Sequence, residues 1–103
     1  MENTRNITEV EELKIGRWGT AWQRFMQENY HDETAKLKES NRWDELALEI
    51  DSEAYSLWEL LRKQYAKANP RPTTFMETMK WENTRGFYVD HEVMEQVVLQ
   101  FRA

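Results

Sequence analysis

The charged side chains best suited to binding chemistry lie in two neighbouring segments of opposite sign, within a sequence of 103 residues. Between Trp43 and Leu60 there is no Lys or Arg, and the carboxylates are Asp44, Glu45, Glu49, Asp51, Glu53 and Glu59. The next segment, through Pro72, has no carboxylate and contains the set Arg62, Lys63, Tyr65, Lys67 and Arg71. Carboxylates in a row can dock into a cationic groove, whereas cations interleaved with aromatic rings are typical of contact with single-stranded nucleic acid.

Both segments also fit a simpler interpretation, in which they are the solvated faces of amphipathic helices. Glu45, Glu49 and Glu53 recur every four residues, so on a helix they form a row of like charges that costs roughly a few tenths of a kcal/mol per pair. A row that costs stability favours a functional reason for it. We therefore predict that the acidic set binds a partner, and we keep the basic set as an alternative that the formal net charge of -5 weakens.

A catalytic interpretation would rest on the two histidines, which stand beside carboxylates in the runs His31–Glu33 and Asp90–Glu92. Adjacent residues on a helix point in different directions, whereas metal ligation uses the three- or four-residue spacing that brings side chains together. We therefore predict no catalytic residues, no metal site and no cofactor. A small metal-dependent nuclease built on these runs is the third alternative.

Composition narrows the class of protein further. The sequence has no cysteine, which excludes disulfides, thiolate nucleophiles and iron-sulfur clusters. No apolar run approaches the roughly 18 residues that cross a bilayer, and the start, MENTRNITEVEELK, lacks the basic and apolar regions of a signal peptide. We expect a soluble cytoplasmic protein without membrane contact.

The charged residues must be positioned by a single helical domain, which we expect to cover residues 13–103. Residues 1–12 are expected to form a loosely held arm that precedes it. Gly16 and Gly19 predict a turn, and Thr20 with Gln23 fits a capping box that starts a helix running to about Lys38. The apolar side chains of this helix recur at helical spacing. Trp18 and Trp22 are therefore expected in the core and not on a nucleic-acid stacking surface.

The second helix is the clearest in the sequence, because its apolar stripe runs from Trp43 to Ala68 without Gly or Pro. Asn41 is its expected N-cap, and Asn69 to Pro72 end it. Its length of roughly 39 Å requires a partner along the whole stripe, which is either the remaining helices or a second copy of the chain.

The last third of the chain predicts one or two further helices. Thr74 with Glu77 offers a capping box for a helix from Phe75 to Arg85, which would bury Phe75, Met76, Met79 and either Trp81 or Asn83. Gly86 favours a break, with Asp90 capping a last helix that buries Val93, Val97, Val98 and Phe101. The predicted fold is all-α, a single small bundle of three or four helices with one long central helix.

The run from Ile15 to about Ala54 resembles the small TnpV-type proteins carried by bacterial transposons and conjugative elements. The matching residues are Ile15, Gly16, Trp18, Gly19, Arg24, Phe25, Met26, Glu28, Glu49, Ile50, Asp51 and Ala54. The later residues Trp81, Asn83 and Arg85 look like that family's asparagine-arginine segment, after a shortened connection near Pro70 to Pro72. That family has no established enzymatic role, so the resemblance implies a cargo protein of a mobile element and not a mechanism.

The sequence also looks like the small acidic helical anti-CRISPR proteins that such elements carry. This likeness implies a partner, a type II RNA-guided Cas nuclease of the bacterial host, whose cationic channel would receive the acidic set in competition with guide RNA or target DNA. We therefore expect a non-enzymatic anti-CRISPR inhibitor in the bacterial cytoplasm. The alternative is a nucleic-acid-binding accessory protein of the element.

Overall fold

The computed structural model describes residues 14–103, so the predicted arm of residues 1–12 lies outside the described part of the chain. The elements are the helices α2 (Arg17–Asn29), α3 (His31–Glu39), α4 (Trp43–Ala68) and α5 (Phe75–Val93), followed by the π-helical turn η1 (Met94–Val98). Residues 14–103 form no strand. The predicted all-α fold with one long helix is confirmed.

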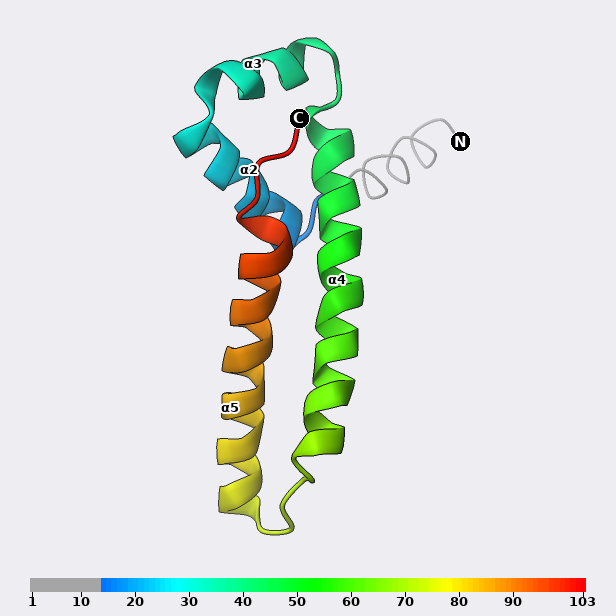
Figure 1. Ribbon diagram of the computed structural model, residues 1–103, viewed down its shortest axis with the longest axis vertical. Coiled ribbons are helices and arrows are strands. Elements are labelled where there is room, and N and C mark those ends of the chain that lie inside the picture. Colours follow the sequence, from blue (N-terminus) through cyan, green and yellow to red (C-terminus); the bar gives the residue numbers. More distant parts are fainter. Residues whose placement is uncertain (1–13) are drawn as a thin grey trace, which may run out of the picture.

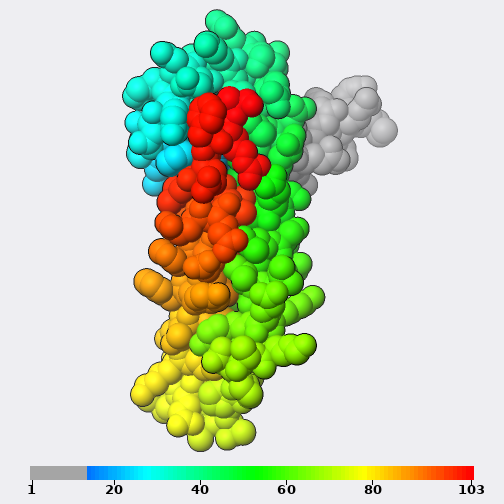
Figure 2. Space-filling model, viewed as in Figure 1, coloured from blue at the N-terminus to red at the C-terminus, as the bar shows by residue number. Residues whose placement is uncertain are grey.

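Helices α4 and α5 form a long antiparallel hairpin, and the other elements gather at one end of it (Figure 1). At that end α4 packs against α2, α3 and η1, and the C-terminal segment lies across the same region, as the red atoms of Figure 2 show. We call this end the head (residues 15–54 and 89–102). The other end, the stalk (residues 55–88), consists of two helices and the loop that joins them.

The core lies in the head. Trp22, Met26, Ile50, Val93 and Val98 are fully buried there. The indole Nε1 of Trp22 donates a hydrogen bond of 3.1 Å to the backbone carbonyl of Gln100, so the largest core side chain also holds the C-terminal segment. Trp18 is buried as well, at 8% exposed. The prediction that these two indoles belong to the core, and not to an exposed stacking surface, is confirmed.

The predicted helix from Thr20 to about Lys38 is wrong in two respects. It begins earlier, at Arg17, with Thr20 inside it and no side-chain cap, and it ends at Asn29, where α3 takes a new direction. The chain turns at Tyr30, whose ring packs 4.7 Å from the ring of Phe101. A contact so distant in sequence leaves no local signal.

The predictions for α4 hold at both ends, with one correction at the start. The helix covers Trp43–Ala68 as predicted, but Arg42 occupies the N-cap position, and Asn41 instead takes the positive φ of 61° that ends the preceding turn. The Thr74 cap of α5 is confirmed, because its hydroxyl accepts a hydrogen bond of 3.3 Å from the backbone N–H of Glu77.

Helix α5 differs from the prediction along most of its length. It passes through Gly86 without a break, and Asp90 lies inside it instead of capping a new helix. Phe75, Met76 and Met79 were expected in the core but are 76%, 66% and 48% exposed. The reason is that only α4 packs against α5 in the stalk, so only the α5 face that carries Trp81 is covered.

Four of the remaining core predictions for this region hold. Trp81, Val93, Val97 and Val98 are buried, whereas Asn83 is exposed and Phe101 is 48% exposed.

Among residues 14–103, no helix is both long enough and apolar enough to span a bilayer.

Candidate protein-interaction surfaces on α4 and α5

The carboxylate of Asp51 is used inside the fold. Its Oδ1 accepts a hydrogen bond of 2.9 Å from the backbone N–H of Gly19, and its Oδ2 accepts one of 3.2 Å from that of Gly16. Helix α2 has no cap from its own residues, so Asp51 on α4 satisfies its first amides and places a negative charge at the positive end of its dipole. The Asp51 side chain is partly buried between two helices, so it belongs to the contact between α2 and α4, and we leave it out of the candidate binding surface.

This arrangement also explains Gly16 and Gly19, which do not form the predicted positive-φ turn. A Cβ at Gly16 would lie 2.5 Å from Asp51 Oδ2, and one at Gly19 would lie 2.5 Å from the backbone carbonyl of Ala47. Close approach of α2 to the backbone of α4, and not backbone conformation, requires glycine at position 19, whereas a Cβ at position 16 would displace the Asp51 carboxylate. We call this contact the glycine clasp (Gly16, Gly19 and Asp51).

Two more members of the acidic set have partners in the head. Glu53 forms a bidentate ion pair with Arg102, at 2.7 and 2.8 Å, which attaches the C-terminal segment to α4. The hydrogen bond from Arg102 lowers the pKa of Glu53 below its ordinary value. Asp44 accepts a hydrogen bond of 3.1 Å from the side chain of Gln23 on α2. The sequence could not show these pairings, because they depend on which elements pack beside α4.

The three remaining carboxylates of the set are exposed and form no hydrogen bond with another element among residues 14–103, and we call them the acidic ridge (Glu45, Glu49 and Glu59). The side chain of Glu45 is 66% exposed and lies 3.8 Å from Arg42, a distance that leaves it largely in solvent. No ion pair involves Glu49 or Glu59 within residues 14–103. On a helix of 3.6 residues per turn these three side chains share the side of α4 opposite its buried stripe.

The structure keeps only part of the basic set together, because Arg62 and Lys63 line one hollow whereas Tyr65 and Arg71 have other contacts. Tyr65 packs 5.7 Å from the Trp81 ring and 6.0 Å from the Tyr88 ring, so it supports the contact between α4 and α5. Arg71 forms an ion pair of 2.8 Å with Glu82. Arg62 packs on another residue of α4, with its guanidinium 4.6 Å from the centre of the Trp58 ring. Lys63 and Lys67 are exposed.

A shallow hollow of about 260 Å³ lies beside Arg62, and its lining is Trp58, Glu59, Arg62, Lys63, Ala66 and Arg85. Sequence reasoning missed Arg85 as a charged member of this region. Its side chain is only 9% exposed; it donates to Glu82 at 2.9 Å, and its Nε has no partner among the described residues. The available signal was the spacing of Arg85 four residues after Trp81, which places a guanidinium on the covered side of α5.

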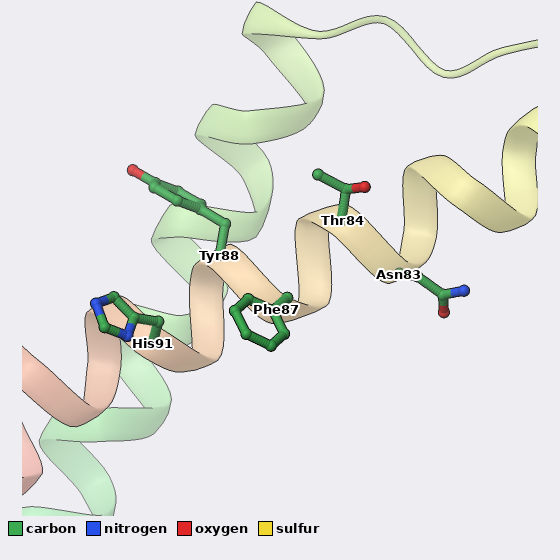
Figure 3. A pocket seen from close by; sticks show the side chains of 5 residues that line it. All are labelled: Asn83, Thr84, Phe87, Tyr88 and His91. Atoms are coloured by element: carbon green, nitrogen blue, oxygen red, sulfur yellow. The ribbon is translucent and has the colours of Figure 1, made fainter.

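A second open surface lies along α5. Its hollow, of about 540 Å³, is lined by Asn83, Thr84, Phe87, Tyr88 and His91, all from α5 itself (Figure 3). Phe87 is 79% exposed. His91, one of the two histidines considered as catalytic, also lines this hollow. Within residues 14–103, no group of three His, Cys, Asp or Glu side chains is placed to hold a metal ion.

Comparison with models of protein families, with curated proteins and with solved structures finds no match to this chain. Several residues behind the likeness to TnpV-type proteins nevertheless meet in space, because Gly16, Gly19 and Asp51 are the three members of the glycine clasp. The clasp joins α2 to α4, so these residues have a structural role.

Proposed function

We propose that this protein is a non-enzymatic, TnpV-like product of a bacterial mobile genetic element that acts in the host cytoplasm as an anti-CRISPR inhibitor. In this proposal the acidic ridge of α4 binds the cationic nucleic-acid channel of a type II RNA-guided nuclease. The observation that supports it is the exposure of Glu45, Glu49 and Glu59 on one side of α4, while the other carboxylates of the set serve the fold.

The physical basis is electrostatic complementarity. An RNA-guided nuclease holds its heteroduplex in a positively charged channel and recognises the backbone, not the sequence. A rigid helix that carries carboxylates would be attracted to the same channel, and attraction between opposite charges raises association rates, an effect that added salt weakens.

The test is guide-directed DNA cleavage by type II nucleases, with this protein added before or after the guide RNA. Inhibition is expected when the protein comes first, and weaker inhibition when the guide is already bound. Unchanged cleavage in both orders would end the proposal.

A charge reversal assigns the effect to the ridge. The variant Glu45→Lys, Glu49→Lys, Glu59→Lys should lose inhibition while it keeps its helical circular dichroism, because all three side chains are exposed. The control makes the same change in net charge away from α4, at exposed positions in α2, α3 and η1: Glu28→Lys, Glu39→Lys, Glu95→Lys. Equal loss in both variants would mean that net charge, and not the ridge, is responsible.

A second candidate function has its own observation. The hollow beside Trp58 brings together Arg62, Lys63 and the partly unsatisfied guanidinium of Arg85, an arrangement suited to a phosphate group beside an aromatic ring. We propose as the alternative that the protein is a nucleic-acid-binding accessory factor of the element.

This alternative predicts salt-sensitive retention of single-stranded RNA or DNA. Retention should weaken in the variant Arg62→Ala, Lys63→Ala, and the slope of its salt dependence should fall by about 1 for each phosphate that the protein no longer neutralises. The control is Lys36→Ala, Lys38→Ala, which removes two exposed cations from α3. A flat titration with the unaltered protein would dismiss the alternative.

A further inference from the structure

The exposed apolar side chains of the described residues are concentrated on α5. Nine large hydrophobic residues are exposed in this part of the chain, and five of them belong to α5: Phe75, Met76, Met79, Phe87 and Tyr88. A large side chain of this kind has a surface of about 150 to 250 Å². With the exposed fractions of these five side chains, their exposed area is on the order of 600 Å² in total. Such a concentration on one helix is typical of an interface and not of a solvated face.

Gly86 lies in the middle of the same helix, and no contact within the described residues explains why this position is a glycine. Glycine destabilises a helix interior, its φ here is not positive, and a Cβ at this position would meet nothing within 4 Å. Gly16 and Gly19 differ, because both face α4 closely. A glycine on an open helix surface permits the close approach of another backbone.

We propose that the outer face of α5 binds the same face of a second copy of this protein, with the two α5 helices antiparallel and crossing near Gly86. The two α5 helices then lie side by side at the centre of a layer of four helices, and the contact covers the face of α5 that α4 leaves open. The contact is isologous, so each copy supplies the same residues to it.

The order of residues along α5 favours this antiparallel register. Lys80 and Asp90 lie equally far from Arg85 in sequence, and so do Met76 and Met94. A two-fold axis at the level of Arg85 therefore places each lysine beside the partner's aspartate and each Met76 beside the partner's Met94. Asp90 uses Oδ1 for Arg17, at 3.0 Å, which leaves Oδ2 for the lysine.

The available area is consistent with a dimer. From Met76 to Met94 the helix is about 27 Å long. A stable interface buries about 800 Å² on each partner. The five apolar side chains supply most of that area, and the polar residues between them, such as Asn83 and Thr84, supply the remainder.

The first measurement is the molar mass of the full chain by sedimentation equilibrium over a range of concentrations. We expect a reversible dimer that Phe87→Glu weakens at least about tenfold, in line with the loss of a central aromatic anchor. The control is Tyr55→Glu, the same kind of change at a tyrosine that is 54% exposed on α4. A monomer at every concentration, or equal weakening by both variants, would overturn the proposal.

A second variant separates association from folding. Gly86→Leu adds a side chain where nothing lies within 4 Å, so the melting temperature of the dilute monomer should not fall. Dimerisation should nevertheless weaken at least about tenfold, because the side chain stands where the two helices cross. Unchanged dimerisation would overturn the crossing at Gly86.

The register has its own test. Lys80→Glu should weaken the dimer, and adding Asp90→Lys should restore it, since the exchanged charges again lie opposite each other. If the double variant is weaker than Lys80→Glu alone, the antiparallel register is wrong.

Discussion

The head and the stalk use the same helix, α4, in opposite ways. In the head α4 is covered by α2, α3 and η1, and its side chains complete a core of fully buried residues such as Trp22 and Ile50. In the stalk α4 has only α5 beside it, and apolar side chains such as Phe87 remain in solvent. Stability is therefore concentrated at one end of the molecule, whereas the surfaces open to partners lie at the other end and along the back of α4.

The carboxylates of α4 divide by the face of the helix on which they lie and not by the end of the molecule. Asp51 and Glu53 are bound to backbone amides and to Arg102, whereas Glu49, between them in sequence, has no such partner among the described residues. Position on the helix, and not residue type, decides whether a carboxylate serves the fold or the surface.

The largest expected effect comes from the head core. Trp22→Ala should lower the free energy of unfolding by about 4 kcal/mol, because the side chain is fully buried and its removal leaves a cavity and an unpaired carbonyl at Gln100. Tyr55→Ala, at the top of the stalk, should change it by no more than about 0.5 kcal/mol. Urea denaturation followed by tryptophan fluorescence measures both. Comparable decreases in the free energy of unfolding would mean that stability is not concentrated in the head.

Substitution by alanine at the two glycines inside helices should change the stability of the protein in opposite directions. Gly19→Ala places a methyl group against the backbone carbonyl of Ala47 and should cost about 2 kcal/mol. Gly86→Ala adds a methyl group in open space and should stabilise the dilute monomer by roughly 0.5 to 1 kcal/mol. Thermal melts of both variants at low protein concentration give the signs. If Gly19→Ala also stabilises the protein, the close packing of α2 against α4 is not as described.

A smaller effect distinguishes two carboxylates two residues apart. Asp51→Asn should cost about 1 to 2 kcal/mol, because an amide retains only one acceptor oxygen for the two N–H groups of the glycine clasp. Glu49→Gln should stay within about 0.5 kcal/mol, since the side chain is exposed. Chemical denaturation compares them, and an equal decrease in both would assign Glu49 to the fold and remove it from the acidic ridge.

The sequence predicts those parts of the fold that depend on neighbours in the chain. The extent of α4 follows from an apolar stripe without Gly or Pro, and the Thr74 cap follows from its spacing to Glu77. The end of α2 at Asn29 does not follow, and the ring of Tyr30, where the chain turns, packs against Phe101, which is distant in the sequence.

The candidate surfaces were less predictable, for a related reason. Composition identifies the carboxylates of α4, but the partners of Asp51 and Glu53 lie on α2 and on the C-terminal segment, so the sequence overestimates the acidic surface. Apolar character predicts burial of Phe75 and Met76, but both side chains are exposed. Burial requires a second layer, and the stalk provides none on that side of α5.

The smallest expected effect is a pH dependence at the edge of the head. Because Arg102 makes the pKa of Glu53 lower in the folded protein than its ordinary value of 4.5, the ion pair stabilises the protein above pH 4.5 and loses this contribution as the pH falls through the folded-state pKa. Arg102→Gln should therefore lower the free energy of unfolding at pH 7 by no more than about 1 kcal/mol, since solvent screens a half-exposed carboxylate. The difference between variant and unaltered protein should disappear in acid, and denaturation curves from pH 7 to well below the pKa measure it. A difference that grows in acid would mean that Arg102 holds the C-terminal segment through its hydrocarbon chain and not through Glu53.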